Sequence, residues 1–509
     1  MKGIVTSVLL AASLSLAWGQ VQAERSCSDH IRIVRSTANV ITADALKSTR
    51  TLDPSFFGFN LEWLEFQLGL WDPSAHRVLP EVTRIFKAFP GAVYRFPGGT
   101  NANHISWRDA TGPTGSRPEK PYVSWMPPLR AEFGLEEYLR FVNDVGGQAW
   151  YVANLYGSPT GPRSAPELAT EARALSQHVA QRSRYGSPRI LRWELGNELD
   201  RGAHKWSPAK LAQTANLVAQ AIRQGDASAQ FVHLQQEYPA QQANGYTADR
   251  YNRELRAGLA ALKPDLALHF YYDGKPDTPS VNFFLRALCQ VVDSAKSEGG
   301  SGKVWITEHA RVPNGFWVGT PKAMWPETAN LLAAISLADM LIALAPIPEV
   351  SGAFTHSLVA SGSPWPLLHK RADQTLDPSA TLLGMMVLRQ TMKPQVLEAT
   401  QFGGGRGWQG ATYAVRSAVL STTDRGAYTL WSINRSDEAQ TLLLQIKNAP
   451  KELTITGAFR IADQNSITGN HSQADRLQIE RTLPAAKQSG PNRWLIELAP
   501  NSVNALLFH

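Results

Sequence analysis

The sequence predicts an α/β fold, a (β/α)₈ TIM barrel followed by a smaller antiparallel β-sandwich. Between residues 51 and 392, eight short apolar runs alternate with segments whose apolar residues recur at helical spacing. This is the pattern of a closed barrel of parallel strands. Two of the apolar runs end in a glutamate, Glu198 and Glu308. From residue 393 onwards, short β-like runs are separated by turn residues, which is typical of a sandwich.

The bulk composition fits this division and argues against a nucleic-acid partner. The chain has 509 residues, of which 43% are hydrophobic and 18% charged, enough for one large domain and one small one. The formal net charge is +7. Lysines and arginines are scattered along the chain and form no basic run, so no nucleic-acid binding is predicted.

The N-terminal residues predict export. Lys2 precedes an apolar run, and Val21 and Ala23 are the small residues of a cleavage site, so residues 1–23 are interpreted as a signal peptide. No other segment approaches the ~18 uninterrupted apolar residues that suggest a membrane span. We therefore expect an exported protein, periplasmic or extracellular, without a membrane anchor.

The segment after the signal peptide is predicted to join the second domain. The β-like run at residues 31–41 lies too far upstream to belong to the barrel, so residues 24–50 are expected to add a strand to the sandwich. Cys27 and Cys289 are the only cysteines of the chain. In an exported protein they can pair, but the sequence does not show that they meet. It does not indicate the oligomeric state either.

The barrel is predicted over residues 51–392. Its expected strands are residues 56–62, 92–96, 149–155, 190–195, 231–235, 266–272, 304–307 and 350–355. The helices that cover them are expected at residues 79–89, 135–145, 166–182, 208–223, 248–262, 281–297, 329–344 and 380–392. Helical spacing of apolar residues marks each helix, and a short apolar run marks each strand.

The sandwich is predicted over residues 393–509. Its expected strands are residues 413–420, 427–434, 441–446, 453–456, 477–479 and 494–498. Turn residues separate them, which favours antiparallel hairpins. No internal repeat or low-complexity linker divides the chain.

Glu198 and Glu308 are the candidate catalytic residues. Each ends a predicted parallel strand, and the carboxyl ends of barrel strands form the rim where reacting groups sit. Two rim carboxylates are what cleavage of a glycosidic bond requires, one as acid and the other as nucleophile or base. Burial and the second carboxylate are expected to raise the pKa of Glu198 so that it carries a proton, whereas Glu308 must be ionised to attack.

Three stretches carry a resemblance to a known family. They are Gly58-Phe59-Asn60-Leu61-Glu62; Arg95-Phe96-Pro97-Gly98-Gly99 with Trp107-Arg108-Asp109, Gly112-Pro113 and Arg117-Pro118 downstream; and Gly196-Asn197-Glu198-Leu199-Asp200. They resemble the clan A retaining glycoside hydrolases, and within that clan the α-L-arabinofuranosidase family. The resemblance implies a barrel with a β-sandwich and a secreted enzyme that acts on side chains of plant or microbial polysaccharides or on oligosaccharides.

The resemblance also implies roles for individual residues. It makes Glu198 the acid/base and Glu308 the nucleophile, and it places Asn197 as a bridge between a sugar hydroxyl and the nucleophile. Tyr271 would hold Glu308 in position, with His269 on the same side of its strand because alternate strand residues share a face.

Further residues are expected around the sugar. Glu62 would bind sugar hydroxyls, and Arg95 would hold carboxylates in position, since an arginine stays protonated. Trp107 and Asn154 are candidate walls of the subsites.

Two departures from the family pattern leave the sugar open. Thr100 stands where the family usually has asparagine, and its hydroxyl cannot make the same pair of hydrogen bonds. Thr307-Glu308-His309 replaces the more usual Asp-Glu-Trp. Both changes lie near the expected site of reaction.

Two other functions remain in competition. One is a β-glucuronidase-like or heparanase-like hydrolase of the same clan, although that family tends to continue with proline where this chain has Leu199. The other is a catalytically inactive carbohydrate-binding barrel. No metal or cofactor is predicted, because His269 and His309 lack the spacing of metal ligands and residues 403–405 lack the context of a phosphate-binding loop.

Overall fold

The structure is a computed structural model that describes residues 25–122, 127–237, 245–274, 278, 280–313, 327–405, 407, 411–471 and 473–509. The predicted signal peptide, residues 1–23, lies outside the described residues. Within them, no helix is both long and apolar enough to cross a membrane.

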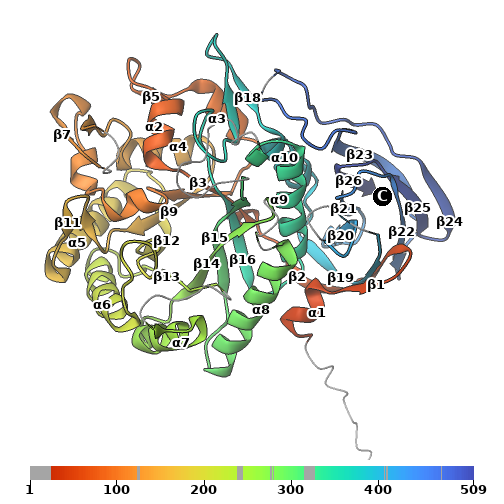
Figure 1. The fold of residues 1–509 in the computed structure, drawn as a ribbon, viewed down its shortest axis with the longest axis horizontal. Helices are drawn as coiled ribbons and strands as arrows, with labels where there is room; N and C mark the ends of the chain where they lie inside the picture. Colours follow the sequence, from red (N-terminus) through yellow and green to blue (C-terminus); the bar gives the residue numbers. More distant parts are fainter. Residues whose placement is uncertain are drawn as a thin grey trace, which may run out of the picture.

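Eight parallel strands close into the predicted barrel (Figure 1). They are β3 (Phe57–Asn60), β6 (Val93–Phe96), β9 (Gln148–Ala153), β12 (Ile190–Leu195), β13 (Phe231–Leu234), β14 (Asp265–Tyr272), β15 (Val304–Arg311) and β16 (Val350–Thr355). Each overlaps one of the eight predicted strands, so the barrel is confirmed. The strands are buried on both faces, as in a parallel sheet covered by helices.

Helices cover the outside of the barrel. They are α3 (Pro80–Phe86), α4 (Leu135–Asp144), α5 (Ala165–Ser183), α6 (Pro208–Gly225), α7 (Ala248–Leu259), α8 (Val281–Ser297), α9 (Leu331–Leu344) and α10 (Ala380–Thr391). Polar side chains cap several N-termini: Ser207, Thr247 and Ser280 accept backbone N–H groups of α6, α7 and α8. One helix, α2 (Trp63–Leu70), follows β3 directly and was not among the predicted helices.

The interior of the barrel has an apolar part and a polar part. Val93, Trp150, Ala267, Trp305 and Phe354 are among the side chains that fill its interior with a compact apolar cluster. The indole N–H of Trp150 donates to the carboxylate of Glu194. This hydrogen bond joins the apolar cluster to a layer of charged and amide side chains. This polar layer is where the candidate site begins.

The second domain is a ten-stranded sheet that folds over one apolar core. Its strands run in the order β23 (Ile455–Ala462), β26 (Ser502–Phe508), β21 (Tyr428–Asn434), β20 (Val415–Ser421), β19 (Gln395–Gly403), β2 (Asn39–Thr51), β22 (Gln440–Lys447), β25 (Arg493–Leu498) and β24 (Ala486–Gly490), with β1 (Ile33–Arg35) beside β19. The predicted N-terminal strand therefore joins this domain, as expected.

Two details of the predicted sandwich were wrong. The sheet is mixed, because β2 pairs in parallel with β22 and β1 in parallel with β19. Residues 477–479 form no strand, and only a single bridge joins the adjacent Glu480 to Arg460. The three strands β19, β24 and β26 were not predicted.

The sheet domain is packed firmly on the barrel. One face of β20, β21 and β26 shares a continuous apolar core with α9 and α10, including Trp431, Ile433 and Val503. Figure 1 shows α9 and α10 standing between the barrel and the sheet. A disulfide between Cys27 of α1 (Cys27–Ile31) and Cys289 of α8 fixes the N-terminal segment to the barrel. The pairing that the sequence left open is thus present.

Candidate active site

Glu198 sits just beyond the carboxyl end of β12, in a tight turn. Gly196 has a φ of +78° and Glu198 a φ of +48°, a left-handed conformation that is uncommon for a residue with a side chain. A Cβ on Gly196 would lie 3.0 Å from Leu199 and 3.2 Å from Leu155. The turn lifts Glu198 out of the strand, and its side chain is 30% exposed. Such local strain is common where a side chain must be aimed at a substrate.

Glu308 lies within β15 at an irregularity of the ladder. Leu268 pairs with Ile306, but His269 pairs with Glu308, so β15 carries one extra residue at Thr307. A bulge of this kind re-aims the side chains that follow it. As a result, both Thr307 and Glu308 contact His269 of the neighbouring strand β14.

His269 and Tyr271 connect the two candidate catalytic residues. His269 Nδ1 lies 2.8 Å from Glu198 Oε1 and 3.4 Å from Glu308 Oε2. The Tyr271 hydroxyl donates to Glu308 Oε2 at 2.5 Å, the contact that the resemblance implies between these two residues. One carboxylate oxygen of Glu198 lies within 4.8 Å of one of Glu308.

The pKa shift of Glu198 is opposite to the one expected, and His269 is the main reason. Burial acts to raise the pKa of Glu198, but the hydrogen bond to His269 and the charge of Arg201 outweigh it and lower that pKa. Burial likewise acts to lower the pKa of His269, but Glu308 and the bond to Glu198 raise it. The predicted rise in the pKa of Glu198 is therefore wrong, because the prediction did not include the hydrogen bond from His269.

The hydrogen bonds of His269 agree with a protonated ring. From Nδ1 it can donate to Glu198, and from Nε2 to the Thr307 hydroxyl at 3.1 Å. Thr307 in turn donates to Glu194 Oε1 at 3.3 Å. Both ring nitrogens thus face acceptors, which favours the imidazolium.

Glu308 is kept ionised. Burial acts to raise its pKa, but the charges of His269 and Arg95 and the hydrogen bond from Tyr271 hold it well below the ordinary value. This is the protonation state that a nucleophilic carboxylate needs.

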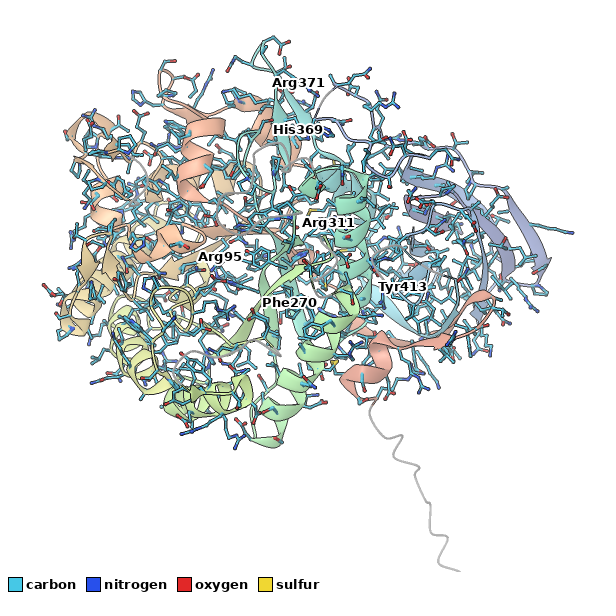
Figure 2. The ribbon with its side chains drawn as sticks, in the orientation of Figure 1. Arg95, Phe270, Arg311, His369, Arg371 and Tyr413 are labelled. Atoms are coloured by element: carbon cyan, nitrogen blue, oxygen red, sulfur yellow. A yellow bond between two sulfur atoms is a disulfide. The ribbon has the colours of Figure 1, made fainter. Side chains whose placement is uncertain are left out.

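Arg95 of β6 is the centre of the polar layer (Figure 2). Its guanidinium is fully buried and donates to both oxygens of Glu194 at 2.6 and 3.0 Å and to Glu308 Oε1 at 2.7 Å. It also donates to the side-chain oxygens of Asn60 and Asn197, each at 2.7 Å. Arg95 thus makes the carboxylate contacts expected of it.

Glu62 lies beside the same group, opposite His356. A Cβ on Gly99 would lie 2.5 Å from Glu62 Oε1, so the two glycines after Pro97 leave room for this carboxyl group. Burial and the neighbouring Glu65 and Glu308 raise the pKa of Glu62 well above its ordinary value. Burial also lowers the pKa of His356 to about 4.

Glu62 and His356 therefore present unused polar atoms. Glu62 Oε1 and His356 Nδ1 lie 3.6 Å apart, and neither has a hydrogen-bond partner among the described residues. Burial disfavours the charged form of both groups. Buried polar atoms of this kind can bond to the hydroxyls of a sugar, and the predicted role of Glu62 stays a prediction.

Three predicted site residues are not brought to the carboxylates by any contact among the described residues. Trp107 packs its ring 5.2 Å from His178 and donates to a backbone oxygen of α5. The amide of Asn154 is used up by the backbone of its own loop and of Ile105. Thr100 is exposed at the start of a short 3-10 helix, Thr100–Asn103.

Asn197 is in the site but makes a different contact from the one expected. Its side-chain oxygen accepts from Arg95, and none of its contacts among the described residues reaches Glu308. Its backbone N–H and C=O both bond to the side chain of Asn103 at 3.3 and 2.7 Å. Asn197 thus fixes the turn that presents Glu198.

Several residues of the site were not predicted. They are Asn60, Asn103, Glu194, Arg201, His356 and Trp365. Glu194 could have been predicted from its place in an apolar strand, because a carboxylate there is seldom buried without a partner. Trp365 packs its ring 5.4 Å from Tyr271 and 4.8 Å from His356, and it comes from a loop with no regular pattern.

The carboxylates could in principle hold a cation, but their surroundings oppose it. Among the described residues, two groups have metal-ligand geometry, Glu62–Glu308–His356 and Glu198–His269–Glu308. Both include Glu308, which already pairs with the Arg95 guanidinium at 2.7 Å. A second cation at this carboxylate would be repelled by the arginine.

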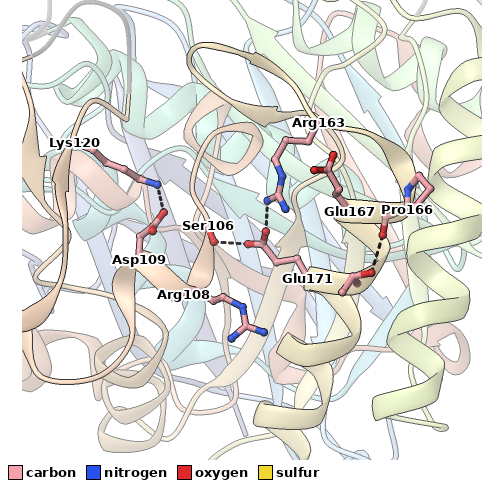
Figure 3. Close-up of a pocket in the computed structure, with 9 residues that line it drawn as sticks. Ser106, Arg108, Asp109, Lys120, Arg163, Pro166, Glu167 and Glu171 are labelled. Carbon is pink, nitrogen blue, oxygen red and sulfur yellow. Dashed lines mark hydrogen bonds and ion pairs between the residues drawn. The ribbon is translucent and has the colours of Figure 1, made fainter.

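A separate surface groove of about 570 Å³ lies beside the start of α5 (Figure 3). Four of its charged side chains form two ion pairs: Arg163 with Glu171, which also accepts from Ser106, and Lys120 with Asp109. The residues that line it include neither candidate catalytic glutamate. We therefore do not assign the reaction to this groove.

Comparison with known proteins agrees with this geometry. No protein-family model matches the chain. Over 259 residues, 48% of its length, it is 26% identical to an intracellular exo-α-(1→5)-L-arabinofuranosidase of Streptomyces lividans. Part of the chain is thus similar in sequence to α-L-arabinofuranosidases. The match covers only 38% of the Streptomyces protein, and a match to a probable α-L-arabinofuranosidase C of Aspergillus clavatus is 24% identical over 155 residues, 29% of each chain.

Solved arabinofuranosidases share the fold over almost the whole chain. The enzyme of Thermotoga maritima, solved with arabinose, superimposes with a TM-score of 0.74 over 93% of this chain and 100% of its own, at 15% identity. The family 51 enzyme of Xanthomonas axonopodis pv. citri gives a TM-score of 0.75 over the same shares, also at 15% identity. The combination of barrel and sheet domain is therefore that of the arabinofuranosidases.

Proposed function

We propose that the protein is a retaining glycoside hydrolase of the α-L-arabinofuranosidase type, with Glu308 as nucleophile and Glu198 as acid/base. The separation of the two carboxylates carries the proposal. One oxygen of Glu198 lies within 4.8 Å of one oxygen of Glu308, and this proximity favours the ~5–5.5 Å spacing of retaining enzymes over the ~6.5–9.5 Å that leaves room for a water in inverting ones.

The reaction would run in two displacements. In the first, Glu308 attacks the anomeric carbon, and the leaving oxygen takes the proton that the Glu198–His269 pair holds. The bond from the anomeric carbon to the leaving oxygen breaks, and a glycosyl ester on Glu308 forms. In the second, Glu198 takes a proton from water, whose oxygen attacks the anomeric carbon and releases Glu308.

The remaining residues supply binding and alignment. Glu62 and His356 would bind hydroxyls of the sugar, and Trp365 with Tyr271 would form an apolar wall beside it. The similarity to named arabinofuranosidases supports a terminal arabinofuranosyl group on a polysaccharide or an oligosaccharide as substrate. The signal-peptide pattern of residues 1–23 supports action outside the cytoplasm, and N-terminal sequencing of exported protein should find a chain that starts after Ala23.

A panel of 4-nitrophenyl glycosides tests the function. We expect hydrolysis of the α-L-arabinofuranoside and little or none of the β-D-glucuronide or β-D-xyloside. The matched control is Glu308→Gln, which keeps the volume of the side chain and should be inactive. NMR spectra recorded during the reaction should show that the product first released has the same anomeric configuration as the substrate. Hydrolysis of the glucuronide alone would support the heparanase-like alternative, and no turnover of any glycoside would support a binding protein.

A further inference from the structure

The boundary between the barrel and the sheet domain contains a cluster of buried charges. Its carboxylates are Asp273, directly after β14, and Asp339 of α9. Its cations are Arg416 of β20 and Arg435, directly after β21. None of the four is more than 3% exposed. Buried ion pairs seldom add stability over apolar packing, so this cluster calls for another explanation.

Arg435 reaches from the sheet domain to the end of a catalytic strand. Its Nη2 lies 3.0 Å from Asp273 Oδ2, and its Nη1 pairs with Asp339 Oδ2. Arg416 bonds to the other oxygen of Asp339 at 2.6 Å and to Asn282 at 2.6 Å. Of these two arginines, Arg435 is the one bonded to the strand that carries His269 and Tyr271.

Asp273 in turn joins the ends of β14 and β15. The Ser336 hydroxyl donates to Asp273 Oδ2 at 2.7 Å and accepts from Arg311 Nη1 at 3.1 Å. Arg311 is the last residue of β15, the strand that carries Glu308. Figure 2 shows Arg311 beside α9, on the side of the barrel that faces Tyr413 and the sheet domain. The cation of Arg435 therefore holds a carboxylate that ties both strand ends together.

The two strand ends fix the position of Tyr271. Tyr271 precedes Asp273 by two residues and donates to Glu308 at 2.5 Å. From the other side, Trp365 donates its indole N–H to the backbone oxygen of Arg311 at 2.7 Å and packs 5.4 Å from the Tyr271 ring. A shift of either strand end would move the hydroxyl that aligns the nucleophile.

We propose that Arg435 is a positioning residue for Glu308, acting through Asp273 and Tyr271. The inference rests on the proposed role of Glu308 as nucleophile. It makes the sheet domain part of the catalytic apparatus: a charge from the second domain sets the geometry of a hydroxyl in the first. Misplacement of a reacting group by about 1 Å can cost up to about 100-fold in rate.

A mutant cycle with Arg435→Met and Tyr271→Phe tests the proposal on an aryl glycoside that the wild type hydrolyses. Arg435→Met should lower kcat by about 10- to 100-fold and leave KM nearly unchanged, because no sugar-binding side chain is removed. In the Tyr271→Phe background, the same substitution should have little further effect, since its route to Glu308 is already lost. Losses in kcat that multiply would overturn the proposal.

Arg416→Met is the matched control. It removes an equally buried arginine from the same cluster, and among the described residues it breaks no hydrogen bond or ion pair with β14 or β15. It should lower the temperature of unfolding and leave kcat unchanged. An equal fall in kcat would mean general loosening of the domain boundary and would overturn the role of Arg435. If Arg435→Met does not fold, Arg435→Lys keeps a cation that cannot span both carboxylates, and the same cycle applies.

A second readout separates this inference from the proposed function. The cycle between positions 435 and 271 can also be measured by denaturant unfolding, which needs no substrate. Coupling in the free energy of unfolding is expected, and its absence would overturn the proposal. If the wild type hydrolyses no glycoside, the proposed function fails, and the unfolding cycle still decides whether Arg435 fixes Tyr271.

Discussion

His269 places its Nδ1 2.8 Å from Oε1 of Glu198. Because the same nitrogen lies 3.4 Å from Glu308 Oε2, one imidazolium stands between the two carboxylates and reduces their repulsion. Its charge lowers the pKa of both glutamates.

The two glutamates should respond differently to substitution. Glu198→Ala should slow substrates with poor leaving groups by about 10²- to 10⁴-fold and activated aryl glycosides far less, since only the former need the proton. Azide should restore turnover of activated substrates by attacking the glycosyl ester without a base. Glu308→Ala should abolish turnover of both kinds. Steady-state rates with paired substrates measure this, and the reverse pattern would exchange the two roles.

Activity should fall on the alkaline side as the Glu198–His269 pair loses its proton. The pKa of His269 is raised above its ordinary value of 6.5, so the proton is held below that raised pKa and lost as the pH rises through it. In His269→Gln the only remaining carrier is a carboxyl group, and the alkaline limb should move to lower pH. Profiles of kcat/KM against pH measure the shift. His178→Gln, remote from the site, should leave the limb in place; an unmoved limb in His269→Gln would contradict the assignment.

Arg95→Met should destabilise the fold as well as stop the reaction. The substitution leaves Glu194 without its guanidinium and Glu308 without one of its counter-charges. Breaking one side of a buried ion pair typically costs about 3–5 kcal/mol, which denaturant unfolding would detect. The double variant Arg95→Met with Glu194→Gln should regain part of the loss, because one uncompensated charge is gone. A single variant as stable as the wild type would show that the layer tolerates unpaired carboxylates.

The disulfide should contribute to stability rather than to catalysis. Cys27 and Cys289 are 262 residues apart in sequence, and removal of such a bond typically costs about 2–5 kcal/mol. Replacement of both by serine should lower the temperature of unfolding and leave kcat near the wild-type value at low temperature. Reductant should reproduce the loss in the wild type and have no effect on the double variant. Equal melting temperatures for the two proteins would contradict a stabilising bond.

The barrel could be predicted because each of its strands contains a short, largely apolar run, such as Phe231–Leu234 with His233 as its one polar residue, and a clear helix follows it. The N-terminal strand could be assigned to the second domain for a simpler reason, its distance from the first barrel strand. Helix α2 was missed because Trp63, Leu64, Phe66 and Leu70 are all buried, so the helix has little polar face to give it a helical period.

The positions of site residues could be predicted only where the alternation of side chains along a strand was enough to place them. Alternation put His269 and Tyr271 on one face, and both reach the carboxylates. It could not reveal the bulge at Thr307, which depends on the neighbouring strand. Nor could spacing tell which way a loop side chain turns, so Trp107 was expected in the site but packs against α5. The pKa of Glu198 was misjudged because it depends on a histidine 71 residues away in the sequence.

The interleaving of the two domains constrains how the chain can be synthesised and divided. β2 leaves the ribosome before any barrel strand, but its partners β19 and β22 follow only after the last one. The backbone N–H and C=O groups of β2 therefore stay unpaired until the barrel has been synthesised. Exposed, unpaired strands are prone to aggregate at such a stage. For the same reason the sheet domain cannot be expressed as a C-terminal fragment or exchanged as a module. A circular permutant that begins in the loop before β3 and joins the old termini would place all ten of its strands in one continuous segment.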